Sequence, residues 1–462
     1  MTSTTTAAPP ARAAWSPRLW GLVIVLAGNM LVDALEVSVM VVAVPSIGAD
    51  LRLTPAAAQW TMTGFAVGFG GLLLFAGRVV ALLGRRRVYL WALFGFAAAS
   101  LVAAFAGDPA TLLATRVVKG FCAALTAPTG LAIIGAIFTA GPGRDRAVSV
   151  YSLFGACGFT AGLVLSGLLT EVGWRWTMVF PAPVVLVLLV LGRTLIPGDM
   201  DARVEGGLRK GQLDLPGALA LTGGLLAVVL TAVTAAERGW ADARTLDAAL
   251  AALGLFAAFR IAEHRAARPL VRATLLRDGP LLRASVGAAA LNGSFLGLLF
   301  VVTHQWQAAQ GWGPLRTGLA LLPASVPLAL TVLSSGRMVQ RFGAARLIVL
   351  GATAPLIGYV LYLRDPAHAT YTTGVLPTLL LVGAGFVCAF AALNTQATAG
   401  VAPAERGPAV ATYQTAVQTG AVLVIAPTAA LLTAYGSRPA MVLVTGVGAL
   451  GLLAALRAPR RS

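Results

Sequence analysis

About fourteen apolar stretches, each of roughly twenty residues, divide this chain of 462 residues. A stretch of that length crosses the ~30 Å hydrocarbon core of a bilayer as an α-helix. Charged residues make up only 11% of the chain, whereas soluble proteins contain about 25%. We therefore predict an all-α integral membrane protein. The predicted helices begin near residues 19, 57, 87, 111, 147, 176, 214, 245, 283, 315, 345, 373, 407 and 438.

The net charge of +17 fits either nucleic-acid binding or membrane topology. If the N-terminus is cytoplasmic, most of the 34 Lys and Arg residues fall in cytoplasmic loops, as the positive-inside rule requires. We therefore expect no nucleic-acid partner and both termini in the cytoplasm. Almost all basic residues are arginine and Gly is abundant, which is typical of GC-rich bacterial genomes. We predict a multi-pass protein of a bacterial cytoplasmic membrane.

The chain shows no sign of a cofactor, a metal site or an enzymatic centre. Its three cysteines lie in apolar stretches and its three histidines are scattered, so neither forms a ligand cluster. It also lacks a phosphate-binding GxxxxGK[ST] loop. ATP is therefore not expected to drive the protein directly, and an ion gradient is the expected energy source.

A short motif occurs twice, as GRVVALLGRRR at residues 77–87 and as GRMVQRFGAAR at residues 336–346. Each copy lies in the loop after the second predicted helix of one half. Two parallel six-helix halves are a known transporter design, and they leave two helices over for the middle of the chain. The predicted domains are a tail 1–18, a half 19–196, a linker 197–213, two inserted helices 214–263, a linker 264–282, a half 283–457 and a tail 458–462.

Four charged residues lie inside predicted membrane helices: Asp33 and Glu36 in the first, Arg116 and Lys119 in the fourth. Each such charge costs roughly 2.5–3.5 kcal/mol at mid-bilayer. Asp33 and Glu36 are three residues apart and share a helix face, where two carboxylates cannot both ionise cheaply. A buried cation needs a partner, so we predict one neutral cluster of four charges that takes and releases protons. The alternative is an ion-pair network that only locks the helices together.

The run EVSVMVVAVP places Glu36 nine residues before Pro45. It resembles the first-helix motif LDxTIVNVALP of the fourteen-helix drug–proton antiporters, a branch of the major facilitator superfamily, with Glu in place of Asp. Asp33 is an addition to that motif. The resemblance covers nearly the whole chain and implies a transporter with the major-facilitator fold, two six-helix halves plus two inserted central helices.

The repeated loop resembles the superfamily signature GxLaDrxGRRR, with Ala81 in place of its Asp and Gln340 there in the second copy. In the family, that Asp helps to latch helix ends through contacts with charges and dipoles. The remaining positions imply a gating loop. Its residues are Gly77, Arg78, Gly84, Arg85 and Arg87.

The fourth helix contains TRVVKGFCAALTAP, which resembles the family pattern RxxQGxGaA with Lys119 in the Gln place. This resemblance implies that Arg116 faces the central cavity and modulates the first-helix carboxylate.

The fifth helix, GACGFTAGLVLSGLLTEVGWRW, resembles the antiporter motif that ends in GPxxGG. Gly158, Gly162 and Gly167 are retained, whereas Leu163 and Ser166 stand in the places of a Pro and a Gly. Small residues at such positions let helices pack closely.

Polar side chains inside the apolar stretches are candidate substrate contacts. An ordinary interhelical hydrogen bond, worth ~0.6 kcal/mol on average, is the alternative for each of them. The candidates are Asn29, Asn292, Gln305, Gln307, Asn394, Gln414 and Gln418. Four aromatic residues are further candidates for stacking on a flat substrate, with plain packing as the alternative. They are Trp60, Phe65, Tyr151 and Tyr413.

We predict a monomeric secondary transporter that exports small amphipathic compounds in exchange for protons. In the expected cycle, Glu36, helped by Asp33, gains a proton in the outward-open state, and its pairing with Arg116 and Lys119 weakens. The halves then rock, and substrate binding from the cytoplasm favours proton release. The alternatives are proton-symport uptake of a metabolite and a non-transporting receptor or scaffold on the same fold.

Overall fold

The computed structural model describes residues 15–139, 141–198, 213–266, 269–364, 370–402 and 405–457, and all regular structure in these ranges is helical. The predicted tail 458–462 lies outside the described residues, as do most of the predicted tail 1–18 and most of the predicted linker 197–213.

The helices before the middle of the chain are α1 Pro17–Asp50, α2 Pro55–Ala58, α3 Trp60–Leu83, α4 Arg85–Ala104, α5 Pro109–Ile137, α6 Pro142–Val172, α7 Trp174–Val179 and α8 Pro181–Leu195. Three helices follow: α9 Leu215–Arg238, α10 Ala243–Arg265 and α11 Ala273–Leu276. The remainder are α12 Gly279–His304, η3 Gln305–Ala309, α13 Pro314–Ala320, η4 Leu322–Ala324, α14 Val326–Thr331, η5 Val332–Ser334, α15 Ser335–Phe342, α16 Ala344–Leu363, η6 Tyr371–Val375, α17 Leu376–Thr398, α18 Arg406–Tyr435 and α19 Ser437–Leu456.

Thirteen helices among the described residues are long and apolar enough to cross a membrane. A fourteenth span is formed if the bent pair Pro314–Ala324 and Val326–Phe342, which meet at 46°, is taken as one. The prediction of an all-α membrane protein with about fourteen helices is confirmed. The observed helices begin close to the predicted positions, and the largest difference is Pro142 against residue 147.

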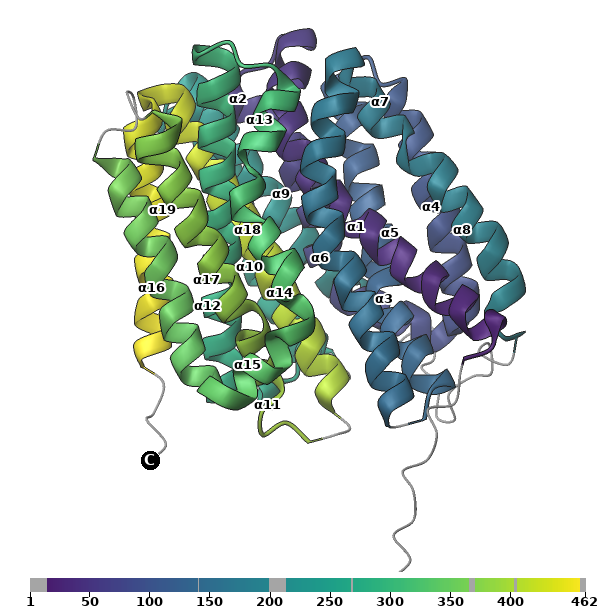
Figure 1. The fold of residues 1–462 in the computed structure, drawn as a ribbon. Helices are drawn as coiled ribbons and strands as arrows, with labels where there is room; N and C mark the ends of the chain where they lie inside the picture. Colours follow the sequence, from purple (N-terminus) through teal and green to yellow (C-terminus); the bar gives the residue numbers. More distant parts are fainter. Residues whose placement is uncertain are drawn as a thin grey trace, which may run out of the picture.

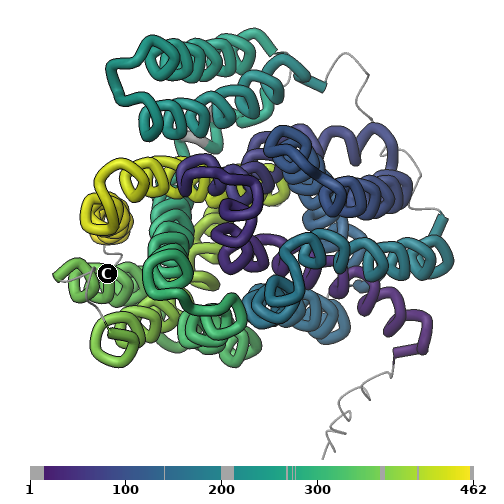
Figure 2. Tube along the Cα trace, turned by 90° about the horizontal axis from the view of Figure 1, so that it is seen from above, coloured from purple at the N-terminus to yellow at the C-terminus, as the bar shows by residue number. Residues whose placement is uncertain are grey.

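The helices form two bundles, with α1 to α8 in the N-terminal bundle and α12 to α19 in the C-terminal bundle (Figure 1). The inserted α9 packs against α3 of one bundle and α18 of the other, and α10 packs against α9. Figure 2 shows this pair at the edge of the molecule, beside the seam between the two bundles. The two inserted helices therefore form a hairpin at the edge of the molecule, outside the two bundles.

The repeated motif has the same backbone geometry in both bundles. Gly84 ends α3 with φ 92° and ψ 148°, and Gly343 ends α15 with φ 79° and ψ 142°. The N–H of Gly84 donates to the carbonyl of Val80 at 3.0 Å, and that of Gly343 donates to Val339 at 2.9 Å. A new helix starts immediately after each glycine. The similarity of the two loops therefore reflects one structural element present in each bundle.

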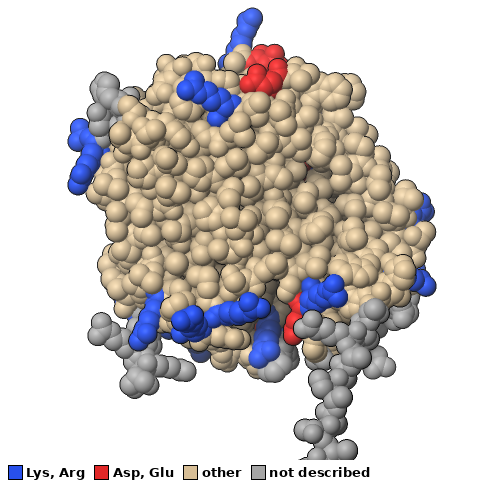
Figure 3. All heavy atoms as spheres, viewed as in Figure 1, with Lys and Arg blue, Asp and Glu red and all other residues tan. Residues whose placement is uncertain are grey.

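The face shown in Figure 3 carries most of its charged side chains near the two rims and few in the broad band between them. This distribution fits a hydrocarbon-facing belt with polar ends. The start of α1 and the end of α19 lie at the same rim, which is the lower edge of Figure 1. We call this rim the termini side.

Hydrogen bonds join the bundles on the side opposite the termini. Gln307 Nε2 donates to the carbonyl of Val42 at 3.0 Å, and the N–H of Leu315 donates to Glu171 at 3.2 Å. Glycine permits the approach there, because a Cβ on Gly167 would lie only 2.7 Å from the Cα of Leu315. The structure is therefore a conformation that is closed on that side.

Candidate functional site

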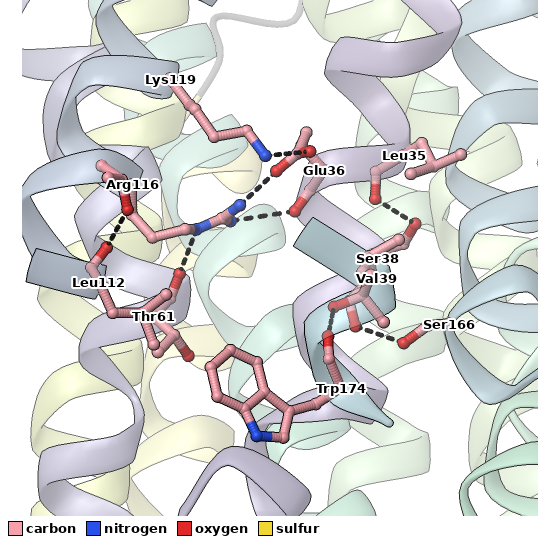
Figure 4. A network of polar contacts seen from close by, with 12 residues as sticks. Leu35, Glu36, Ser38, Val39, Thr61, Leu112, Arg116, Lys119, Ser166 and Trp174 are labelled. Carbon is pink, nitrogen blue, oxygen red and sulfur yellow. Dashed lines mark hydrogen bonds and ion pairs between the residues drawn. The ribbon is translucent and has the colours of Figure 1, made fainter. Parts of the chain in front are cut away.

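A carboxylate held by two cations lies inside the N-terminal bundle (Figure 4). Glu36 of α1 pairs through Oε2 with Nη1 of Arg116, and its Oε1 lies 2.5 Å from Nζ of Lys119. The exposed fraction is 2% for the Glu36 side chain and 0% for both cations. Arg116 and Lys119 are three residues apart on α5, so both reach the same point on α1.

The backbone fixes Arg116 further. Its Nη2 donates to the carbonyl of Glu36 at 3.1 Å, and its Nε donates to the carbonyl of Thr61 in α3 at 2.7 Å. One guanidinium therefore connects three helices. This fork-like geometry is available to arginine and not to lysine.

Aromatic rings cover the two cations. The guanidinium of Arg116 lies 5.1 Å from the ring centre of Phe65, and Nζ of Lys119 lies 4.9 Å from that of Phe96. Such contacts stabilise a desolvated cation. Removing one partner of a buried ion pair costs about 3–5 kcal/mol, because the other charge is left uncompensated. Loss of either partner alone is therefore expected to be strongly destabilising.

Asp33 is not part of this ion pair, so the prediction of a single four-charge cluster is wrong in this respect. Its Oδ2 accepts hydrogen bonds from Asn29 Nδ2 at 2.9 Å and from Thr126 Oγ1 at 3.1 Å. The reason is the rise of the helix, which places Asp33 about 4.5 Å from Glu36 along the α1 axis. At that level α5 presents Thr126 rather than its cations.

The family resemblance implied that Arg116 faces the central cavity, and in this conformation it does not. Its side chain is fully buried within the N-terminal bundle. Phe65, Tyr151 and Tyr413, three of the four predicted stacking residues, are also buried. Trp60 is partly buried at the start of α3. The ion pair is thus closed off from solvent in this conformation.

The glycines of the fifth-helix motif lie where α6 crosses α1. A Cβ on Gly158 would lie 2.4 Å from the carbonyl oxygen of Leu31, and one on Gly162 would lie 2.0 Å from Oγ of Ser38. Ser166 donates to the carbonyl of Val39 at 2.6 Å, where the motif has a glycine. The motif therefore fixes a close crossing of the helix that carries both carboxylates.

The predicted gating residues lie at the end of α3 and the start of α4. Gly84 forms the turn, and a Cβ on Gly77 would meet nothing within 4 Å. The sequence analysis missed Arg86, which donates to the carbonyls of Arg193 at 2.8 Å and Ile196 at 3.0 Å. The last carbonyls of a helix lack helical partners, so Arg86 ties this loop to the end of α8.

The predicted substrate contacts do not gather in one place. Asn29 binds Asp33, and Gln305 accepts from Tyr362 at 2.5 Å. Asn394 donates at 2.9 Å to Phe390 of its own helix.

Three others lie at helix crossings. Asn292 donates to the carbonyl of Val417 at 3.2 Å, and Gln307 joins the two bundles. A Cβ on Gly70 would lie 2.7 Å from that of Gln418, which is partly buried like Gln414.

An aromatic cluster at the seam was not predicted. The ring centre of Phe295 on α12 lies 5.6 Å from that of Phe159 on α6 and 4.6 Å from that of Phe386 on α17. The cluster therefore joins both bundles, and Phe159 and Phe386 are partly exposed. Phe390, one turn further toward the termini side, is 44% exposed. No periodicity in the sequence distinguishes these residues from ordinary apolar ones.

A protein-family model described as "Major Facilitator Superfamily" matches residues 26–425 of the chain. The chain belongs to the Major Facilitator Superfamily. The prediction of a transporter rather than an enzyme is confirmed by this membership.

Named relatives and a solved structure agree with this major-facilitator assignment. The puromycin resistance protein pur8 of Streptomyces alboniger is 37% identical, over 92% of this chain and 85% of that protein. The cephamycin export protein CmcT of Amycolatopsis lactamdurans is 31% identical, over 87% of this chain and 82% of that protein. A crystal structure of the peptide transporter POT in complex with sulfate has a TM-score of 0.68 at 16% identity, over 94% of this chain and 93% of that one. At that identity the last comparison shows the fold alone.

Proposed function

We propose that this major facilitator exports small amphipathic compounds from a bacterial cytoplasm in exchange for protons, as a monomer with both termini cytoplasmic. Two of its relatives are named for resistance to, or export of, antibiotics. The observation that carries the proton coupling is the buried site on α1, where carboxylates lie among apolar helices beside two cations. Placing an ionisable residue inside a membrane costs free energy, and such residues commonly serve as proton relays.

The architecture supports coupling through movement of the bundles. With the termini cytoplasmic, the contacts between Gln307 and Val42 and between Leu315 and Glu171 close the outer side. The structure then represents a state that is closed to the outside. Proton binding on α1 alters the charge balance at the contact with α5, and α1 also carries Val42, which joins the other bundle. A change on α1 is thereby transmitted to the outer closure.

The aromatic cluster at the seam is the proposed substrate contact. Phe159, Phe295 and Phe386 come from both bundles, so a compound bound there interacts with both at once. Asn292 lies one turn from Phe295 on α12 and is partly exposed. Aromatic faces with a few polar groups are suited to amphipathic compounds.

Proton flux in inverted membrane vesicles tests this proposal. Vesicles with an internal acid gradient, reported by a pH dye, receive puromycin and then a panel of other antibiotics. We expect a substrate to dissipate the gradient with the wild-type protein and Glu36→Gln to abolish that response. Asp50→Asn is the matched control, because Asp50 is a carboxylate on the same helix that pairs with Arg175 at the surface.

The outcomes separate export from other activities. Full proton-driven transport by Glu36→Gln would rule out a coupling role for the α1 site. Accumulation of substrate in right-side-out vesicles, driven by a gradient that is acidic outside, would indicate uptake by symport instead. Movement of substrate with no effect of the gradient would exclude exchange for protons.

A further inference from the structure

Asp33 has a different environment from Glu36, although the two are one turn apart. Its Oδ2 accepts from two neutral donors, Asn29 and Thr126. Its Oδ1 is buried and has no hydrogen-bond partner among the described residues, and the same is true of Oη of Tyr89. A buried carboxylate that keeps its charge normally has a cation or a full set of donors. Asp33 has neither.

The other titratable groups near Asp33 do not supply a free cation. Tyr89 of α4, Cys122 of α5 and Tyr151 of α6 are close enough to interact with its charge. Tyr151 already donates to the carbonyl of Ala127 at 2.8 Å. On α1 itself the nearest charge is Glu36, which repels a second negative charge.

The nearest cations, Arg116 and Lys119, are both engaged by Glu36. A proton on Glu36 would leave these two buried cations without their bound carboxylate. A proton on Asp33 leaves the whole ion pair intact. If Glu36 stays ionised while Asp33 takes a proton, the summed charge of the two acids and the two cations changes from zero to +1. The cheaper exchange is therefore at Asp33.

We infer that Asp33 binds and releases the transported proton, and that Glu36 is the fixed counter-ion of Arg116 and Lys119. The inference rests on the proposed proton exchange and assigns its two carboxylates separate roles. One O–H bond forms at the Asp33 carboxylate when a proton arrives from outside water. The same bond breaks when the proton leaves to cytoplasmic water, and no other covalent bond changes.

Chemical labelling tests this assignment in the unaltered protein and without a substrate. Dicyclohexylcarbodiimide reacts with protonated carboxyl groups in apolar surroundings, and mass mapping locates the adduct. In liposomes we expect about tenfold more adduct on Asp33 than on Glu36, because Glu36 is bound by two cations. Adduct on Asp33 should fall as the pH is raised. Preferential labelling of Glu36, or of neither residue, overturns the inference.

Transport by variants gives an independent test, with puromycin as the probe. The Asp33→Asn variant should exchange internal for external puromycin at a rate within about twofold of the wild-type rate. It should lose the accumulation of puromycin that a pH gradient drives. Asp33→Glu keeps an acid there and should restore accumulation. Glu36→Gln should lose both activities, because two buried cations are left unpaired. Asp50→Asn should resemble wild type.

The two proposals fail in different ways. If the wild type shows puromycin-driven proton flux and Asp33→Asn retains it, the assignment to Asp33 is wrong and exchange for protons stands. If the wild type moves puromycin without proton flux, the proposed exchange itself fails. If Asp33→Asn does not fold, labelling of the wild type still decides the assignment.

Discussion

Arg116 binds Glu36 at two points. Nη1 donates to the side-chain carboxylate, and Nη2 donates to the backbone carbonyl of the same residue at 3.1 Å. A side-chain pair alone would let α1 rotate or slide against α5. The second bond fixes the height of α1 as well, and the bond to Thr61 extends the connection to α3. The ion pair therefore sets the register of three helices, in addition to neutralising charge.

Arg116→Lys keeps the positive charge and removes this geometry. A lysine ammonium is a point charge and cannot bind the carboxylate and two backbone carbonyls in one plane. Each lost hydrogen bond to a charged group is worth about 1.5–3 kcal/mol. We expect a lower unfolding temperature in detergent and at least tenfold slower puromycin transport.

Arg175→Lys is the control for Arg116→Lys, because Arg175 forms an ion pair at the surface, where its side chain is 45% exposed. It should change the unfolding temperature little. Equal stability of both variants would show that charge alone matters at Arg116.

Gly162→Ala tests the close crossing of α6 and α1. The added Cβ would lie 2.0 Å from Oγ of Ser38 and 3.0 Å from the carbonyl of Leu35. Overpacking of this kind costs about 1–3 kcal/mol, so we expect a clear loss of thermal stability and of transport. Gly446→Ala is the matched control, since a Cβ there meets nothing within 4 Å. If both substitutions are tolerated equally, the crossing is not tight.

Phe159→Ala removes one ring of the aromatic cluster at the seam. If substrates stack there, the KM for puromycin should rise about tenfold, corresponding to roughly 1.4 kcal/mol of lost contact. Proton-dependent coupling should survive, since α1 is untouched. Phe94→Ala is the control, because Phe94 is 52% exposed on α4 and stacks only with Trp91 among the described aromatic pairs. An unchanged KM for Phe159→Ala would move the substrate site elsewhere.

The two copies of the loop motif predict paired effects. Gly84 and Gly343 have backbone angles that side chains rarely adopt, so alanine at either position should cost about 1–3 kcal/mol. Both variants should lose thermal stability by similar amounts. Gly77→Ala, at an open helical position, should be neutral or stabilising. A loss at one copy alone would contradict their equivalence.

Most of the helices were predictable because each depends on its own residues. A long apolar stretch has no other stable conformation in a bilayer than a helix with all its backbone hydrogen bonds formed. Prolines at the first turn mark several starts, as at Pro17 and Pro109. The bent span was less predictable, since the chain between Pro314 and Phe342 breaks into short helical pieces under tertiary packing.

The candidate site was predictable in its residue types and not in its pairings. A charge in an apolar helix is visible in the sequence, and so are the acids on α1 and the bases on α5. Which acid meets which base depends on the relative height and rotation of two helices far apart in the chain. Those are set by glycine crossings such as Gly158 against Leu31.

By itself, the sequence determined that the chain crosses a membrane many times, that one loop motif occurs twice, and that buried acids and bases must have partners. Hydropathy, helix period and the cost of burying charge are local properties, so one chain displays them. Only the tertiary structure decided that Glu36 takes both cations, that Asp33 is left with neutral donors, and that three phenylalanines meet at the seam. Those outcomes depend on how closely the surfaces of different helices fit together, and a small shift of one helix against another changes which side chains meet. The pattern of residues along the chain does not encode that fit.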